Sequence, residues 1–350
     1  MTRSAARVTA PEPDVTILCH MAAIDDPAAP VARNPRREAQ KVAGDAFDAR
    51  VLEPSPPAVV DGDLFADDPV ARDGSTGLPV LAPVSSADLT WDRWLEERPE
   101  RTPWAAARWL GAWRRLPPLA PTYAETRLAL HRLVVYVASP ARQRVNGKMA
   151  LRWTFGGLGT PFFGDDEQVR VADARLVRQR GPAAEAAAVT TLNEAAELVL
   201  DGPPDLAWAQ RFDVPAAGDL DEPLAVDPEA AAFLGDWFGF AWSVLEELRD
   251  EPASTEASRT QLWPEHFDAA FDCLPDDRRC TFGASPGDAA VPEPYLYVLP
   301  WRFDEAPSSE LWNSTSFRGA ILPFARLVDA ADQRAWALQF LRRGRALLER

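Results

Sequence analysis

The chain has 350 residues, of which 47% are hydrophobic, so it is long enough for one large folded domain or two small ones. Its formal net charge is −16, which opposes non-specific binding to nucleic acids and to anionic membranes. We therefore expect neither kind of partner.

Residues 1–85 are rich in Pro, Ala and Asp and show no sustained hydrophobic periodicity. Such a segment buries too little apolar surface to offset the entropy lost on ordering it, so a disordered arm is predicted. Met21 within this arm could also serve as the initiator. A single folded domain is expected over 86–350.

The first half of this domain, 86–200, is predicted to run from helices through strands to a helix. Thr122 and Glu125 make a capping-box pattern, and Pro140 ends or kinks the helix that follows. The hydrophobic period then changes to 2, and Asp173-Ala174 marks a hairpin. The helices are expected at 88–98, at 103–116, from 122 and at 191–200, and the strands at 148–155, 169–172, 176–179 and 187–190.

The second half, 228–350, follows a Pro- and Asp-rich loop at 201–227. Asp227-Pro228-Glu229 is a strong helix start, and the helix should bury Trp237 and leave Glu247 on its polar side, where Ala is tolerated. Strands are expected at 262–271, 278–283, 294–300 and 317–322, and a last helix after an N-cap at Asp329.

The order of these elements predicts an α+β fold in which an antiparallel sheet is covered by helices. Helix, about four strands and helix occur twice, in the halves 86–200 and 228–350. One tetrad also recurs, as Thr154-Phe155-Gly156-Gly157 and Thr281-Phe282-Gly283-Ala284. Four matched positions can arise by chance, so duplication of the two halves stays open.

Three cysteines, Cys19, Cys273 and Cys280, form no CxxC pair, and this sparse odd number fits a reducing compartment. No apolar run reaches the ~18 residues of a membrane span, and the N-terminus lacks the apolar stretch of a signal peptide. A cytoplasmic location is predicted.

The segment Leu262-Trp-Pro-Glu-His-Phe-Asp268 carries the candidate catalytic residues Glu265, His266 and Asp268. On a strand, His266 and Asp268 would share one face, and such a pair suits acid–base chemistry because imidazole titrates near neutral pH. The alternative is a structural histidine held by a nearby carboxylate.

The candidate ligand-binding residues follow from charge and glycine content. From Arg93 to Arg152 there are 12 basic and 4 acidic residues, a net charge of +8. This segment either docks on the acidic remainder or binds a small anion. The candidates are Arg142, Lys148, Arg152, Gly156, Gly157 and Ser285.

Two further patterns around these candidates are weak. Ser285 lies in a GxSxG pattern, but Pro286 follows it and has no N–H for an oxyanion hole. With only three histidines and no characteristic ligand spacing, neither a metal nor another cofactor is expected.

The segments NGKMALRWTFGGLGTPFF, LWPEHFDAAFD and GASPGDAAVPEPYLYV resemble those of an uncharacterised group of actinobacterial proteins, over about residues 125–349. The resemblance implies no activity. The sequence therefore favours a non-catalytic binding or interaction protein for a small, anionic ligand. The alternative is a hydrolase that uses Glu265, His266 and Asp268.

Overall fold

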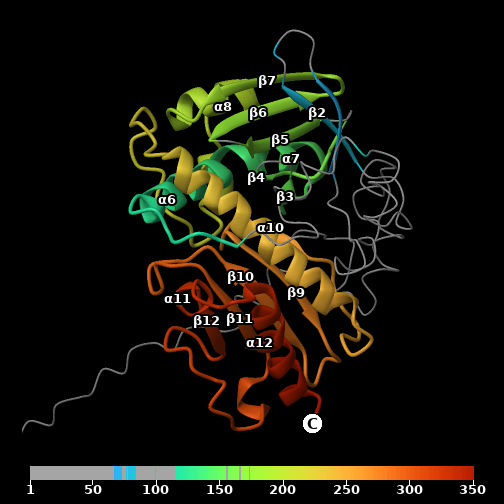
Figure 1. The fold of residues 1–350 in the computed structure, drawn as a ribbon. Helices are drawn as coiled ribbons and strands as arrows, with labels where there is room; N and C mark the ends of the chain where they lie inside the picture. The colour runs from blue at the N-terminus through green and yellow to red at the C-terminus, as the bar shows by residue number, and fades with distance from the viewer. Residues whose placement is uncertain are drawn as a thin grey trace, which may run out of the picture.

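In the computed structural model, the described residues are 67–72, 76, 78–83, 99, 115–154, 157–164, 167–172 and 174–350. They form helices and two five-stranded antiparallel sheets, which confirms the α+β class. Figure 1 shows the first sheet and its helices in green, the long helix that follows them in yellow, and the second sheet with the last helices in orange and red.

The first sheet is a meander in which each strand pairs with the next one along the chain. The predicted hairpin at Asp173-Ala174 is confirmed, because Ala172 pairs with Arg175 on either side of it. Helix α8 (Leu192–Leu200) follows the sheet, and the side chain of Thr191 caps it by accepting from the N–H of Glu194. The strands are β3 (Arg152–Thr154), β4 (Gly157–Gly159), β5 (Glu167–Ala172), β6 (Arg175–Arg180) and β7 (Ala183–Ala188).

A long helical segment precedes this sheet. It consists of α6 (Tyr123–Leu133), a π-helical turn η3 (Val134–Ala138) and α7 (Ser139–Asn146). Pro140 does not end the segment, because the π turn directly before it accommodates the residue that cannot donate an N–H. Gly147, at φ +80°, ends the segment in the left-handed conformation.

The second sheet repeats this layout. Helix α10 (Pro228–Asp250) precedes it, after the short α9 (Leu206–Ala209), and α11 (Phe324–Leu327) and α12 (Gln333–Leu348) follow it. Asp332 caps α12, so the N-cap predicted at Asp329 is wrong by three residues. The strands are β8 (Gln261–Trp263), β9 (Asp268–Cys273), β10 (Cys280–Ser285), β11 (Tyr295–Pro300) and β12 (Ala320–Pro323), with a 3-10 turn η4 (Phe303–Glu305) before β12.

Each half thus holds five strands rather than four. The recurring tetrad does not occupy equivalent places: the first copy spans the connection from β3 to β4, whereas the second lies inside β10, the third strand of its sheet. The similar layout of the halves therefore rests on the order of their elements and not on the tetrad.

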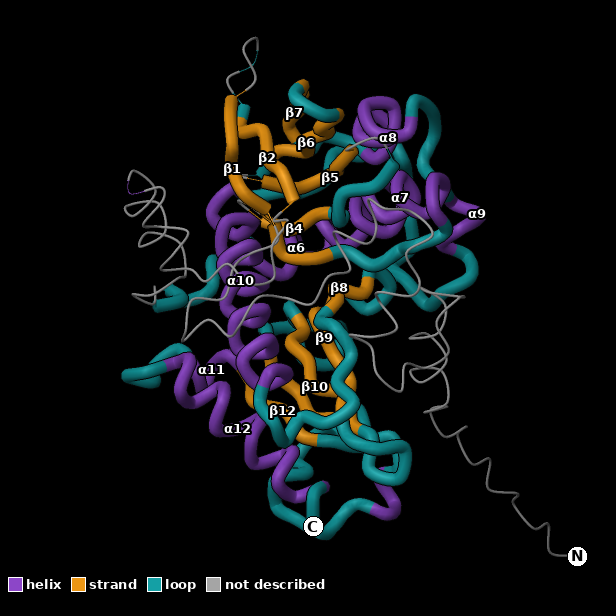
Figure 2. Tube along the Cα trace, turned by 90° about the vertical axis from the view of Figure 1, so that its right-hand side faces the viewer, coloured by secondary structure: helices purple, strands orange, loops and turns teal. Residues whose placement is uncertain are grey.

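The two sheets meet at their first strands. Leu151, next to β3, and Leu262, in β8, exchange both backbone hydrogen bonds, with N···O distances of 2.7 and 2.8 Å. Figure 2 shows β8 and β9 below β4, with α10 running past both sheets. Helix α10 packs on strands of each sheet and buries Leu234, Trp237 and Phe238 completely. The predicted central helix is confirmed, including its Asp227 cap on the N–H of Ala230.

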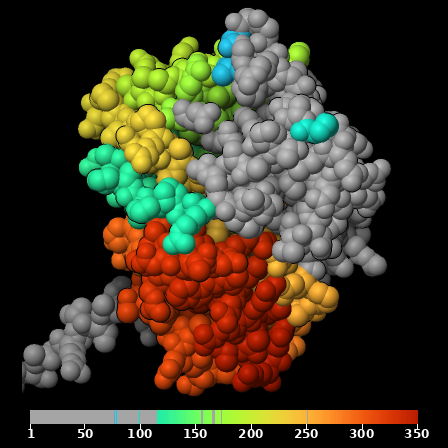
Figure 3. Space-filling model, viewed as in Figure 1, coloured from blue at the N-terminus to red at the C-terminus, as the bar shows by residue number. Residues whose placement is uncertain are grey.

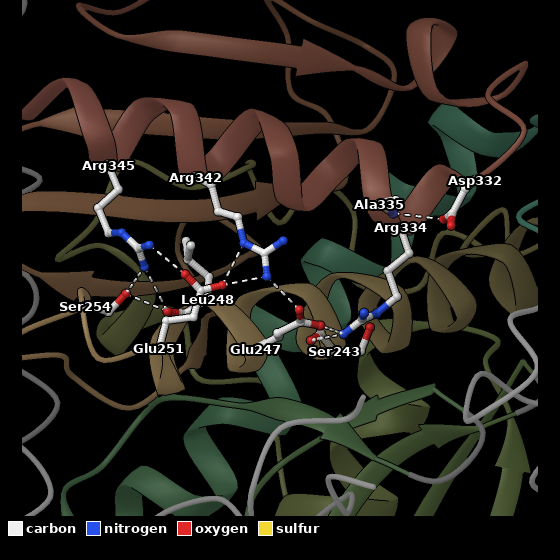
Figure 4. Close-up of polar contacts among 10 residues, drawn as sticks. All are labelled: Ser243, Glu247, Leu248, Glu251, Ser254, Asp332, Arg334, Ala335, Arg342 and Arg345. Carbon is white, nitrogen blue, oxygen red and sulfur yellow. Dashed lines mark hydrogen bonds and ion pairs between the residues drawn. The ribbon is translucent and has the colours of Figure 1, made fainter. Parts of the chain in front are cut away.

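An ionic network joins α10 to α12 (Figure 4). Glu247 pairs with Arg334 and Arg342, and Glu251 pairs with Arg342 and Arg345. The side chain of Glu247 is only 12% exposed. The prediction that this residue lies on a solvent-facing side is therefore wrong, because α12 covers that side of α10.

The N-terminal arm was predicted to be disordered over 1–85. For part of it this is wrong, since β1 (Asp67–Arg72) pairs with β2 (Pro79–Pro83) as an antiparallel hairpin. Thr76 between them donates to the carbonyl of Ala184 in β7 at 3.0 Å, and the hairpin lies next to the first sheet in Figure 2. Most of the remaining arm, the predicted helix at 88–98 and residues 103–114 of the predicted helix at 103–116 lie outside the described residues, while 115 and 116 are described and not helical.

Candidate functional site

The segment with the predicted catalytic residues is a hairpin and not one strand. β8 ends at Trp263, a turn covers 264–267, and β9 begins at Asp268. Phe267 takes a positive φ of +57° and is held there by burial, because its ring stacks on His131 at 5.0 Å and packs edge-on against Phe238 at 5.4 Å. The turn is therefore anchored on α6 and α10.

His131 fixes the same turn by a hydrogen bond. Its Nε2–H donates to the carbonyl of Pro264 at 2.9 Å, which requires a proton on Nε2. Burial lowers the pKa of His131 to about 4. The role of His131 here is structural.

Glu265, His266 and Asp268 all line one small cavity of about 40 Å³ on the face of the second sheet turned away from α10. The volume is enough for only one or two water molecules. Its other described lining residues come mainly from strands β8 to β11: Ser258, Trp263, Ala270, Phe271, Asp272, Thr281, Tyr297 and Trp301.

The carboxyl group of Asp268 bonds to a tyrosine and not to His266. The hydroxyl of Tyr297 donates to its Oδ2, while its buried Oδ1 receives no hydrogen bond from any other described residue. Burial raises the pKa of Asp268. His266 is exposed and makes no hydrogen bond or ion pair with a described residue. The contact that a His–carboxylate acid–base pair needs is thus missing among these residues.

Three other residues that line the same cavity are connected by hydrogen bonds. Trp301 donates its indole N–H to the hydroxyl of Thr281 at 3.0 Å, and Thr281 donates to Asp272 at 2.7 Å. Arg279 lies over the Trp301 ring at 5.4 Å and lowers the pKa of Asp272, but burial outweighs it and the net shift of that pKa is upward.

The predicted anion site at Arg142, Lys148 and Arg152 is packed into the protein. All three are buried, and each takes part in further interactions. Arg142 donates to the carbonyl of Ala150 at 2.8 Å, and Arg152 lies over the ring of Phe162 at 6.0 Å. None of the three cations lines the 40 Å³ cavity.

The two glycines of the predicted anion site do not form a described phosphate loop. Gly156 lies outside the described residues. Gly157 begins β4, and a Cβ there would lie 2.0 Å from the carbonyl oxygen of Val171 in β5. Gly157 therefore permits a close approach of two strands, which is a structural role.

Ser285 ends β10 and is buried. Its hydroxyl accepts from the N–H of Gly287 at 3.1 Å, and the next carbonyl, of Pro286, accepts from Tyr123 at 2.8 Å. The serine thus stabilises a turn that packs against α6. This geometry agrees with the rejection of a nucleophile elbow.

A larger cavity, of about 480 Å³, lies where β12, α11 and α12 meet the loop at 309–313. These elements belong to the red surface in Figure 3. The volume falls in the range of small-molecule sites. Its lining residues are Ser309, Glu310, Leu311, Asn313, Ile321, Leu322, Pro323, Arg326, Trp336, Gln339, Phe340 and Arg343.

Two guanidinium groups at this groove have no partner among the described residues. Arg326 on α11 and Arg343 on α12 are exposed and make no hydrogen bond or ion pair with any described residue. Trp336, 36% exposed, and Gln339 add an indole and an amide from the same side of α12, because residues three, four and seven apart share a helix face. The groove therefore presents, beside an aromatic surface, several donors that no described residue accepts.

Asn313, in the loop at 309–313, also lines this groove. Its amide donates to the carbonyl of Ile321 at 3.1 Å and accepts from the N–H of Ile321 at 2.8 Å. It thereby satisfies part of the free edge of β12, which pairs on its other side with β11.

Sequence reasoning missed this groove. Trp336 lies at the exposed margin of the last helix. The spacing of Trp336, Gln339 and Arg343 was a usable local signal. Arg326 could not be found in this way, because it comes from another helix.

No protein-family model matches the chain, and no match was found among curated proteins or solved structures. The resemblance to an actinobacterial family stays a prediction. Across the described residues there is no group of three or more His, Cys, Asp or Glu that could hold a metal ion. None of the helices in that part of the chain combines the length and apolarity needed to cross a bilayer.

Proposed function

We propose that the protein is a non-catalytic binding protein whose groove between β12, α11 and α12 takes a small anionic ligand with a planar part. The observation that carries the proposal is the pair Arg326 and Arg343, two guanidinium groups without a partner in the described structure that line one 480 Å³ cavity. In a chain of net charge −16, two arginines that line one groove and form no ion pair with a described residue are a specific feature.

Arginine suits this role because its fixed fork of N–H donors matches the oxygens of a carboxylate or phosphate. The indole of Trp336 offers a face on which a flat group can stack and an N–H that no described residue accepts. Leu311, Ile321 and Phe340 supply apolar wall. A ligand with an anionic end and an aromatic body satisfies both parts of the groove.

The proposed ligand is anionic, as expected from the sequence, but the residues proposed to bind it are different. Lys148 and Arg152 are buried, whereas Arg326 and Arg343 are open to solvent. The hydrolase alternative has less support, because His266 makes no hydrogen bond to Asp268 and the cavity beside them holds only one or two waters.

A cytoplasmic location is part of the same proposal. Cys273 in β9 and Cys280 in β10 lie opposite each other in the strand register, and both are buried free thiols. Burial raises the pKa of Cys273 to about 12 and that of Cys280 as well, so neither is reactive. Adjacent cysteines that stay reduced fit a reducing compartment.

The test is thermal unfolding of the full chain with phenyl phosphate, inorganic phosphate and the neutral analogue benzyl alcohol. At about 100 times its Kd, phenyl phosphate should stabilise the protein by about 2.7 kcal/mol. Inorganic phosphate should act more weakly, benzyl alcohol should have no effect, and the shifts should shrink as salt is added.

Arg326→Gln combined with Arg343→Gln should abolish the shift, and Trp336→Ala should remove the advantage of phenyl phosphate over phosphate. Arg302→Gln is the matched control, because Arg302 is also exposed in this half but pairs with Glu305 at 3.7 Å. If the wild type shows no shift with either anion, or if the double variant keeps it, the proposal is wrong.

A further inference from the structure

The 40 Å³ cavity on the outer face of the second sheet has the opposite character to the groove. Glu265, Asp268 and Asp272 line it, and its described lining residues include no lysine or arginine. Four aromatic rings without a charge, those of Trp263, Phe271, Tyr297 and Trp301, also line it. Carboxylates together with the faces of aromatic rings are the groups that attract an organic cation.

The hydrogen bonding of Asp268 is a second indication of a ligand, independent of which residues line the cavity. The residue is 7% exposed, and its Oδ2 is taken by the Tyr297 hydroxyl. Its Oδ1 is fully buried and receives no hydrogen bond from any other described residue. A buried polar atom without a partner costs about 1–3 kcal/mol, and Asp268 lines the cavity, so its carboxylate is a ready acceptor for an incoming donor.

The surroundings hold this acceptor in place. Asp268 begins β9 directly after Phe267, whose ring is fixed between α6 and α10. Tyr297 lies over Gly283 of β10, where a Cβ would approach the tyrosine ring to 2.3 Å, so only glycine leaves room for the ring. The Tyr297–Asp268 hydrogen bond is therefore set by the packing of β9, β10 and β11.

We infer that this cavity binds a primary ammonium group, with the Oδ1 of Asp268 as its acceptor and Trp263, Tyr297 and Trp301 around it. The size of the cavity decides between cations. An ammonium head fits a space of one or two waters, while a tetramethylated head does not. The rest of the amine would leave through the open side, past the exposed His266. This site is separate from the proposed anion groove and does not depend on it.

The experiment measures the melting temperature of the full chain at constant ionic strength, with sodium chloride replaced by methylammonium or tetramethylammonium chloride. Methylammonium at about ten times its Kd should raise the melting temperature by roughly 3 °C. Tetramethylammonium should give no rise over sodium. Equal effects of the three cations would overturn the inference without any variant.

Asp268→Asn provides the second arm, because asparagine keeps the shape and can still accept from Tyr297 while the charge is lost. This variant should lose the methylammonium shift and keep the phenyl phosphate shift of the groove. Asp304→Asn is the matched control: Asp304 is an exposed acid of the same half that pairs with Arg318. A methylammonium shift that survives in Asp268→Asn contradicts the assignment of the acceptor.

Discussion

Replacing Glu247 by alanine should destabilise the protein far more than its place on the helix surface suggests. Glu247 pairs with Arg334 and Arg342 across the interface of α10 and α12 (Figure 4). Burial lowers the pKa of Arg334, and Glu247 is the main charge that opposes this shift. The variant would leave the Arg334 guanidinium buried with the carbonyl of Ser243, at 3.3 Å, among its remaining acceptors.

Breaking a buried ion pair costs about 3–5 kcal/mol, because the remaining charge has lost its solvent and its partner. Glu247 is 12% exposed and Arg334 8%, so the lower end, about 3 kcal/mol, applies to this pair. Arg342 is 44% exposed and keeps Glu251, so its loss adds less than about 1 kcal/mol.

Urea unfolding followed by circular dichroism measures this change as a shift of the midpoint at constant slope. Asp304→Ala is the control, since the Asp304–Arg318 pair is exposed at 76% and 53% and should contribute no more than about 1 kcal/mol. Glu247→Leu with Arg334→Met should recover more than half of the loss, because two apolar side chains leave no buried charge. A loss for Glu247→Ala no larger than that for Asp304→Ala would refute the reasoning.

Two further predictions concern stability. Burial lowers the pKa of His131 to about 4, so the unfolded chain takes up a proton first as the pH falls, and stability should drop between pH 6.5 and 4 by about 3 kcal/mol. The difference between the wild type and His131→Gln over this window isolates the effect from Asp268 and Asp272, whose raised pKa values act in the opposite direction; a flat difference curve would exclude it. Trp237→Ala should cost about 3–5 kcal/mol because its side chain is fully buried, whereas alanine at the exposed Leu128 should cost less than about 1; equal losses in urea unfolding would mean that α10 is not central.

The sequence predicted α10 well because its signals are local. An Asp N-cap, a proline at the first helical position and a broad apolar stripe all act within a few residues of one another. The hairpin at Asp173-Ala174 and the α+β class were predictable for the same reason, since the change of hydrophobic period from helix to strand is a short-range pattern.

The hairpin of β8 and β9 shows a feature that local sequence patterns do not predict. The alternation around His266 favoured one strand, yet Phe267 adopts φ +57° because its ring is buried between residues of α6 and α10. These partners lie far away in the chain. Their packing decides that Asp268 faces Tyr297, and no spacing within 262–268 carries that information.

The sequence by itself determined the central helix, the hairpin at Asp173-Ala174 and the broad class of fold, because capping and periodicity depend on neighbours within about four residues. Only the tertiary structure decided which charged side chains are buried or paired and which are exposed. It buries Lys148 and Arg152, pairs Glu247 across two helices, and leaves Arg326 and Arg343 open on one groove. A charged side chain has the same local signal in each of these places, and only the element packed against it fixes its partner.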